Sequence, residues 1–277
     1  MSDPRHAQLD RWYRRNYTFD GIEVPSVTTL NKNLHSWELE NWKIRRAIDL
    51  TLRTATRARR EVHKEAEPNA KGERHYSGVV GDIIKELAKP SQAATQGISV
   101  HEALDSWFST GRVPPATDAE QPYIEQAIRW AMEWNPRPLY MEPEVYSETG
   151  YAGSVDGVFE IGGQTVIVDF KTGGLYESAT MQLAAYAHAD RLYPRTAAEP
   201  CAVLAGGTCE CAWVVMPPAD RLAVLALRPD AYELQWVTPI AAGLAWKAFL
   251  GALHQHQLKK YKALFVTARQ PAVEEAA

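Results

Sequence analysis

The chain has 277 residues, of which 45% are apolar and 23% charged, and these ordinary globular values argue against a disordered or fibrous protein. It contains no run of about 18 apolar residues and no apolar stretch behind basic N-terminal residues, so neither a membrane span nor a secretory signal is predicted. Three cysteines cannot complete a disulfide framework, which predicts a reducing, cytoplasmic setting. The net charge of −4 is uneven, because residues 1–90 hold 17 Lys and Arg against 13 Asp and Glu. A polyanionic partner is therefore not excluded, since binding responds to local patches.

The N-terminal third is predicted to be mainly helical. After a turn and short strand over residues 19–30, helices are expected at about 37–67, 76–87, 94–109 and 119–134, with a break near 68–72. Five basic side chains share one face of the first helix, namely Arg46, Arg53, Arg57, Arg60 and Lys64. Glu61 and Glu65 are interleaved with this basic stripe, so it is interpreted either as a solvated face or as a surface that follows a phosphate backbone.

The pattern changes to strands after about residue 140. Strands are expected at 144–147, 152–161, 165–170, 211–216 and 222–227, with helices at 178–192 and about 239–264. Gly162 and Gly163 are predicted to form a two-residue hairpin turn. Helices flanking a small central sheet indicate one α/β domain, with a helical N-terminal region (1–90), a core (91–265) and a frayed tail (266–277).

The predicted hairpin gathers charged side chains on one face. If Gly162-Gly163 is a two-residue turn, Asp156 lies directly opposite Asp169, and Lys171 shares their face. Like charges opposite one another destabilise a sheet, and carboxylates that share a site share either a proton or a metal. Hard oxygen ligands suit Mg²⁺ or Mn²⁺, which would activate a water while Lys171 holds that water or the developing charge. The pattern indicates phosphodiester hydrolysis; the alternative is that both aspartates cap turns or lie on a solvated face.

Four motifs occur in a characteristic order along the chain. They are Gly97–Leu104, which contains His101, then Gly-x-x-Asp at Gly153–Asp156, Asp-x-Lys-Thr at Asp169–Thr172 and Gln-x-x-x-Tyr at Gln182–Tyr186. Together they resemble the RecB-like branch of the PD-(D/E)XK nucleases, and Val24–Leu30 looks like the opening of bacteriophage and prophage exonucleases of that branch. Two departures are Val155 in place of the name-giving proline and Asp169 where many relatives have Glu. The resemblance implies a restriction-endonuclease-like fold, with a mixed central sheet flanked by helices.

The resemblance also implies roles for individual residues. His101, Asp156, Asp169 and the backbone carbonyl of Phe170 become metal ligands, and Lys171 becomes the catalytic lysine. Gln182 and Tyr186, one helical turn apart, would brace the site and touch DNA, or would simply pack the helix. Glu144 would be either an additional acid behind the site or a solvated strand residue.

Other cofactor signals are weak. Cys201, Cys209 and Cys211 are all C-terminal and cannot supply a four-cysteine iron–sulfur cluster; they are interpreted as small buried residues, with a zinc site as the alternative. No P-loop is present, so no nucleotide is expected. The sequence thus predicts an Mg²⁺- or Mn²⁺-dependent deoxyribonuclease, an exonuclease of phage or recombination-type DNA processing. The resemblance implies that its products carry 5′-phosphates. Its expected partners are DNA and a recombination or replication protein, and no membrane. The alternatives are a structure-specific endonuclease of the same fold and an inactive DNA-binding or assembly module.

Overall fold

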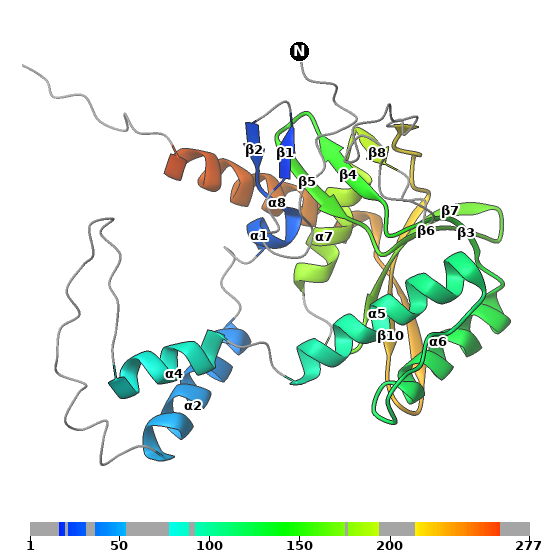
Figure 1. Ribbon diagram of the computed structural model, residues 1–277. Coiled ribbons are helices and arrows are strands. Elements are labelled where there is room, and N and C mark those ends of the chain that lie inside the picture. The colour runs from blue at the N-terminus through cyan, green and yellow to red at the C-terminus, as the bar shows by residue number, and fades with distance from the viewer. Residues whose placement is uncertain are drawn as a thin grey trace, which may run out of the picture.

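The computed structural model describes residues 17–19, 22–31, 37–53, 78–88, 92–174, 177–193 and 214–260. Within these ranges the protein is mixed α/β, with seven helices, a five-stranded mixed sheet, a four-stranded antiparallel sheet and a small β1–β2 hairpin (Figure 1). None of the described helices combines the length and the apolar content needed to cross a membrane.

The five-stranded sheet is built around β7. Its order is β11 (Tyr232–Trp236), β10 (Arg221–Leu227), β7 (Gln164–Lys171), β6 (Gly157–Ile161) and β3 (Arg137–Met141), and only the β10–β7 pair is parallel. The β6–β7 hairpin has the predicted register, with Ile161 paired to Gln164. Gly162 and Gly163 have φ of 59° and 79°, and a turn that needs positive φ at both positions strongly favours glycine.

Two helical layers cover the faces of this sheet. The helices α5 (Gln92–Thr110) and α6 (Gln121–Trp134) pack on one face. Every second residue of β7, namely Val166, Val168 and Phe170, points to this face and joins a core rich in aromatic rings. On the opposite face lies α7 (Glu177–Ala187), with α8 (Pro239–Lys260) packed behind it (Figure 1). Ile167 points into this second core, so Asp169 and Lys171, which have the same parity along β7, lie on the α7 face.

A short N-terminal helix, α1 (Val27–Asn31), joins the second sheet to α7. That sheet has the order β5 (Tyr151–Ser154), β4 (Glu144–Ser147), β8 (Arg191–Tyr193) and β9 (Val214–Val215). Ser26 Oγ accepts the Thr29 N–H at 3.0 Å and so caps α1, while Ser26 forms a parallel bridge with Ala152 of β5. Val27 and Leu30 are fully buried, and Asn31 Nδ2 donates to the carbonyl of Ser178 at 3.0 Å. The helix therefore fixes the N-terminal end of α7.

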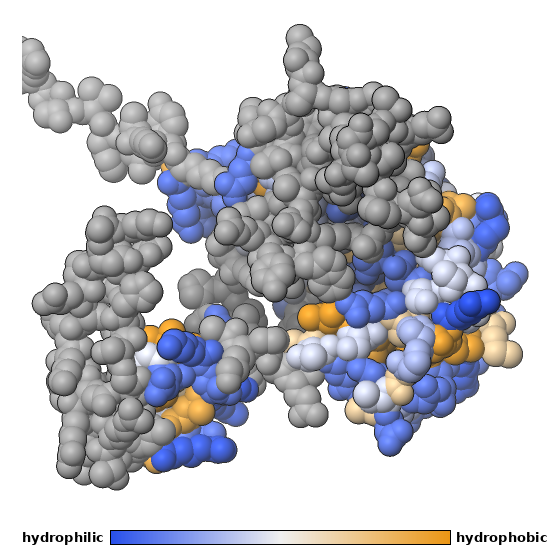
Figure 2. Space-filling model, viewed as in Figure 1, coloured by the Kyte–Doolittle hydropathy of each residue, from blue (hydrophilic) through white to orange (hydrophobic). Residues whose placement is uncertain are grey.

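Two further N-terminal helices form a separate pair. The helices α2 (Trp37–Arg53) and α4 (Gly78–Ala88) pack on each other, and Figure 1 shows them beside the sheet-containing body. Ile44, Ile48 and Leu52 of α2, spaced four residues apart, are more than half exposed. Hydrophobic and hydrophilic residues are mixed on the visible surface of this pair (Figure 2).

Several predicted elements are confirmed, and four need correction. The turn and short strand predicted over residues 19–30 give way to the helix α1 at Val27. The strands at 144–147, 165–170 and 222–227 and the helices at 94–109, 119–134 and about 239–264 all appear with small shifts at their ends. The strand predicted at 152–161 is instead two strands on different sheets. The helix predicted at 178–192 ends at Ala187. Beyond it, Asp190 Oδ2 accepts hydrogen bonds from the Ser147 hydroxyl and the Glu148 N–H, each at 2.8 Å, and these bonds hold the chain beside β4. The strands β3 and β11 were not anticipated, and of the strand predicted at 211–216 the described part forms only β9.

Candidate active site

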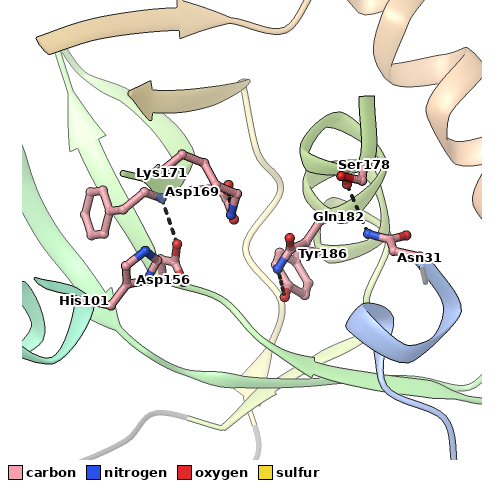
Figure 3. Close-up of polar contacts among 9 residues, drawn as sticks. Asn31, His101, Asp156, Asp169, Lys171, Ser178, Gln182 and Tyr186 are labelled. Carbon is pink, nitrogen blue, oxygen red and sulfur yellow. Dashed lines mark hydrogen bonds and ion pairs between the residues drawn. The ribbon is translucent and has the colours of Figure 1, made fainter. Parts of the chain in front are cut away.

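Asp156 lies in a bend between β5 and β6, where the chain crosses from one sheet to the other. Its neighbour Val155 donates its N–H to Pro143, so both residues are held outside the β6–β7 ladder, which begins with the Gly157–Val168 pair. The prediction that Asp156 pairs directly with Asp169 is therefore wrong. Instead, Asp156 Oδ2 accepts a hydrogen bond from the N–H of Phe170 at 2.7 Å (Figure 3). Beyond the end of the β6–β7 ladder, this carboxylate oxygen replaces the backbone carbonyl that a continued strand would offer. The bend still delivers the carboxylate to the C-terminal end of β7.

His101 reaches the same place from α5. Its Nδ1 lies 3.4 Å from Asp156 Oδ1, and its ring meets the Phe170 ring edge-on at 6.0 Å between centroids. The helix comes this close because Gly97 has no side chain, since a Cβ there would lie 3.0 Å from Thr172 Oγ1. Two motifs that are far apart in the sequence, one around His101 and one around Lys171, are thus packed against each other.

Asp169 and Lys171 project together from β7. Lys171 Nζ lies 2.5 Å from Asp169 Oδ2, as expected for side chains on one face (Figure 3). The Asp169 side chain is only 2% exposed, whereas that of Lys171 is 29% exposed and so reaches solvent. Asp169 Oδ1 accepts no hydrogen bond from any described residue. A buried carboxylate oxygen without a donor is costly, and such an atom is available to coordinate a cation.

Burial and mutual charge set the protonation of this cluster. Burial, followed by the charge of Asp156, raises the pKa of Asp169 to about 6, although Lys171 opposes this rise. Burial also works against ionisation of Asp156, but the charge of His101, its contact with His101, Lys171 and the Phe170 N–H together hold the pKa of Asp156 below its usual value. The pKa values of His101 and Lys171 are both raised, because the neighbouring carboxylates outweigh the effect of burial. The pKa values of the two aspartates are therefore shifted in opposite directions, upward for Asp169 and downward for Asp156.

Gln182 and Tyr186 form a pair on α7. Gln182 Nε2 donates to the Tyr186 hydroxyl at 2.8 Å, and Tyr186 is 2% exposed. The ring packs against Gly153, where a Cβ would lie 2.7 Å from Tyr186 Cε1, which explains the glycine of the Gly-x-x-Asp motif. Burial raises the pKa of Tyr186 well above its usual value, and the charges of Asp156 and Asp169 add to this rise. Tyr186 is thus placed to brace the site, while its burial argues against the predicted contact with DNA.

The remaining predicted residues are placed differently. Glu144 is 2% exposed, so its interpretation as a solvated strand residue is wrong; it lies on β4, paired with Ser154. Of the basic stripe, Arg46 lies 3.7 Å from Glu86 and Arg53 pairs with Asp49 at 2.9 Å. The other stripe residues (Arg57, Arg60 and Lys64), the three cysteines and the tail lie outside the described residues.

One residue near the site was not anticipated from the sequence. Arg228 follows the last residue of β10, and its Nη1 donates to the carbonyl of Gly173 at 2.5 Å, two residues beyond Lys171. Only the parallel pairing of β10 with β7 brings it there, and nothing in the local pattern of the sequence indicates that pairing.

The donor set fits a hard divalent cation. Mg²⁺ is usually held by one or two carboxylates and completes its octahedron with water and substrate oxygens. Lys171 contacts Asp169 Oδ2, the Phe170 N–H donates to Asp156 Oδ2, and His101 lies 3.4 Å from Asp156 Oδ1. Asp169 Oδ1 is therefore the carboxylate oxygen most available to such an ion, and Asp156 Oδ1 is shared with His101. Among the described residues, no three His, Cys, Asp or Glu side chains converge into a cage made by the protein alone.

A scan of the sequence against family models and a search of the curated proteins each returned no match.

Proposed function

We propose that the protein is a metal-dependent DNA nuclease of the RecB-like PD-(D/E)XK type, with a restriction-endonuclease-like core, and that it acts as an exonuclease. The observation that carries this proposal is a pair of contacts at one end of β7: His101 lies 3.4 Å from Asp156, whose other oxygen accepts the Phe170 N–H, and Lys171 lies 2.5 Å from Asp169. These residues come from α5, a sheet-switching bend and a central strand. A purely structural role does not account for a buried carboxylate with a donor-free oxygen beside a solvent-reaching lysine.

Each residue of the site would have a separate role in the hydrolysis. Asp156 and Asp169 supply the oxygen ligands, and His101 orients Asp156 or shares the ion with it. A divalent ion bound there would lower the pKa of its water and neutralise charge on a phosphoryl oxygen. Lys171 Nζ, charged and partly exposed, is placed to hold the attacking water or the charge that develops on the phosphate. Tyr186, through Gln182 and Gly153, supports the α7 side of the site.

The test is cleavage of end-labelled linear single- and double-stranded DNA and of closed circles, each with Mg²⁺, Mn²⁺ or EDTA. We expect linear DNA to be degraded in both metals and to survive in EDTA. The Lys171→Ala variant should be inactive, while Lys247→Ala, which removes an exposed lysine of α8, should retain wild-type activity. Cutting of closed circles as fast as linear DNA would refute the exonuclease assignment. Failure to cut any of these DNAs in either metal would refute the nuclease.

A further inference from the structure

Arg228 lies on the face of the sheet that carries the candidate active site. In the parallel β7–β10 pair, Asp169 is level with Val224 and Lys171 with Ala226. Paired residues of neighbouring strands point to the same face, and so does the residue two positions further on. Arg228 therefore follows Ala226 on the Lys171 face, roughly two residues or about 7 Å further along the strand direction.

The Arg228 side chain has backbone hydrogen-bond acceptors but no carboxylate partner in the part of the chain that the structure describes. Its backbone N–H donates to Ala231 at 2.8 Å, which closes the β10–β11 turn, and its Nη1 donates to Gly173. Other arginines of the chain pair with carboxylates, namely Arg46, Arg53, Arg129, Arg137 and Arg191. Among the described residues, no carboxylate lies within ion-pair distance of Arg228, and its Nε and Nη2 make no hydrogen bond. A half-buried guanidinium thus retains its charge and two donors beside an acidic site.

We propose that Arg228 is a phosphate clamp, which binds a backbone phosphate next to the one that is cut while its Nη1 fixes the loop after Lys171. This inference rests on the proposed nuclease function. Phosphates of one DNA strand follow each other at about 3.4 Å along the helix axis, so a cation about 7 Å from Lys171 matches a phosphate one or two nucleotides away. The planar fork of arginine can hold a carbonyl with one nitrogen and a phosphate with the other two, which a lysine cannot do.

The experiment measures DNA binding by variants that separate charge from the loop contact. Glutamine at position 228 can still donate to Gly173 but has no charge, whereas lysine keeps the charge and loses the fork. Both are made in the inactive Lys171→Ala background, and binding of a labelled duplex is followed with Mg²⁺ across a salt series. Arg221→Gln is the matched control, because Arg221 begins the same strand at its opposite end and lies over Trp236 at 4.3 Å. Thermal melts report whether each variant is folded.

A phosphate contact predicts a specific pattern. Arg228→Gln should lower the slope of log affinity against log salt by about 0.9 and weaken binding roughly ten-fold or more, while Arg228→Lys and Arg221→Gln keep the slope. In the active enzyme, Arg228→Gln should raise KM more than it lowers kcat, since the contact precedes the chemical step. If Arg228→Gln melts much lower, protection of wild-type Arg228 from phenylglyoxal by bound DNA replaces it, with Arg221 as the unprotected reference.

Three results would overturn the inference. An unchanged salt slope in folded Arg228→Gln, or equal phenylglyoxal labelling with and without DNA, would show that Arg228 does not touch phosphate. Equal losses of slope in the glutamine and lysine variants would show that the slope does not depend on the charge at position 228. In each of these three cases wild-type cleavage would leave the nuclease proposal standing, whereas a wild type that neither binds nor cuts DNA would remove both proposals.

Discussion

Replacement of Asp169 by asparagine tests the electrostatics of the site in the metal-free protein. Burial and Asp156 raise the pKa of this carboxyl from 3.8 to about 6, so the folded protein binds a proton more tightly than the unfolded chain. The stability that this proton contributes is fully present below about pH 4 and is lost as the pH rises through about 6. At 1.36 kcal/mol per unit, the ionised carboxylate costs on the order of 3 kcal/mol near neutral pH.

Asparagine keeps the shape of the neutral carboxyl and cannot ionise. We therefore expect Asp169→Asn in EDTA to be more stable than wild type near pH 7.5, by up to about 3 kcal/mol, and this advantage should shrink to about 0.5 kcal/mol near pH 4. In a protein of this size each kcal/mol corresponds to about 2–4 °C in melting temperature. The wild type should gain on the order of 2.7 kcal/mol from Mg²⁺ at about 100 times its Kd, and the variant should lose most of that gain together with its activity.

The assay is a set of thermal melts of both proteins in EDTA across this pH range, followed by a Mg²⁺ titration. Asp118→Asn, which neutralises an exposed loop carboxylate, is the control and should shift neither the pH profile nor the metal response. If Asp169→Asn melts well below wild type in EDTA near neutral pH, Asp169 is a structural hydrogen-bonding residue. The carboxylate metal site would then have to be abandoned.

Four further substitutions have expected outcomes. Lys171→Ala should abolish cleavage but retain Mn²⁺ binding in calorimetry, because an ammonium group is not a metal ligand. In EDTA this variant should melt below wild type, since Asp169 loses its counter-charge. Loss of Mn²⁺ binding would contradict the role assigned to Lys171. Arg53→Ala should leave the salt slope of DNA binding unchanged, because Asp49 already holds that guanidinium, whereas a fall of about 0.9 would reveal a phosphate contact. Gly153→Ala should lower stability by about 1–3 kcal/mol in denaturant titration, because its methyl group would collide with Tyr186 and Val27. Gly243→Ala on α8, where nothing lies within 4 Å, should instead stabilise by up to about 1 kcal/mol, and equal effects of the two would contradict the packing argument.

The features predicted correctly depend on local geometry. A two-glycine turn fixes the register of the strands it joins, so the pairing of Ile161 with Gln164 followed from the sequence. Side-chain alternation along one strand then placed Asp169 and Lys171 together and turned Val166, Val168 and Phe170 to the opposite core. These conclusions need no knowledge of distant partners.

The features that were missed depend on pairing between distant segments. The bend at Asp156 exists because β5 pairs with β4 in one sheet while β6 pairs with β7 in the other, and a continuous apolar pattern does not reveal that crossing. The strand β11 alternates half-buried and exposed residues at the edge of its sheet, which gives a weak strand signal. Likewise, the position of Arg228 follows only from the parallel pairing of β10 with β7.

The central position of β7 also determines the order in which its contacts can form while the chain is being synthesised. Its hairpin with β6 is local and can form early, but its parallel neighbour β10 begins only at Arg221, and the helix α8, which packs behind α7, ends at Lys260. Such long-range contacts form late, because loop closure precedes the gain from pairing. On the ribosome, the environment that raises the pKa of Asp169 is therefore incomplete until β10 has emerged and paired with β7. Incomplete chains carry the motif without its buried environment, so a translation product cut short before β10 is expected to be inert.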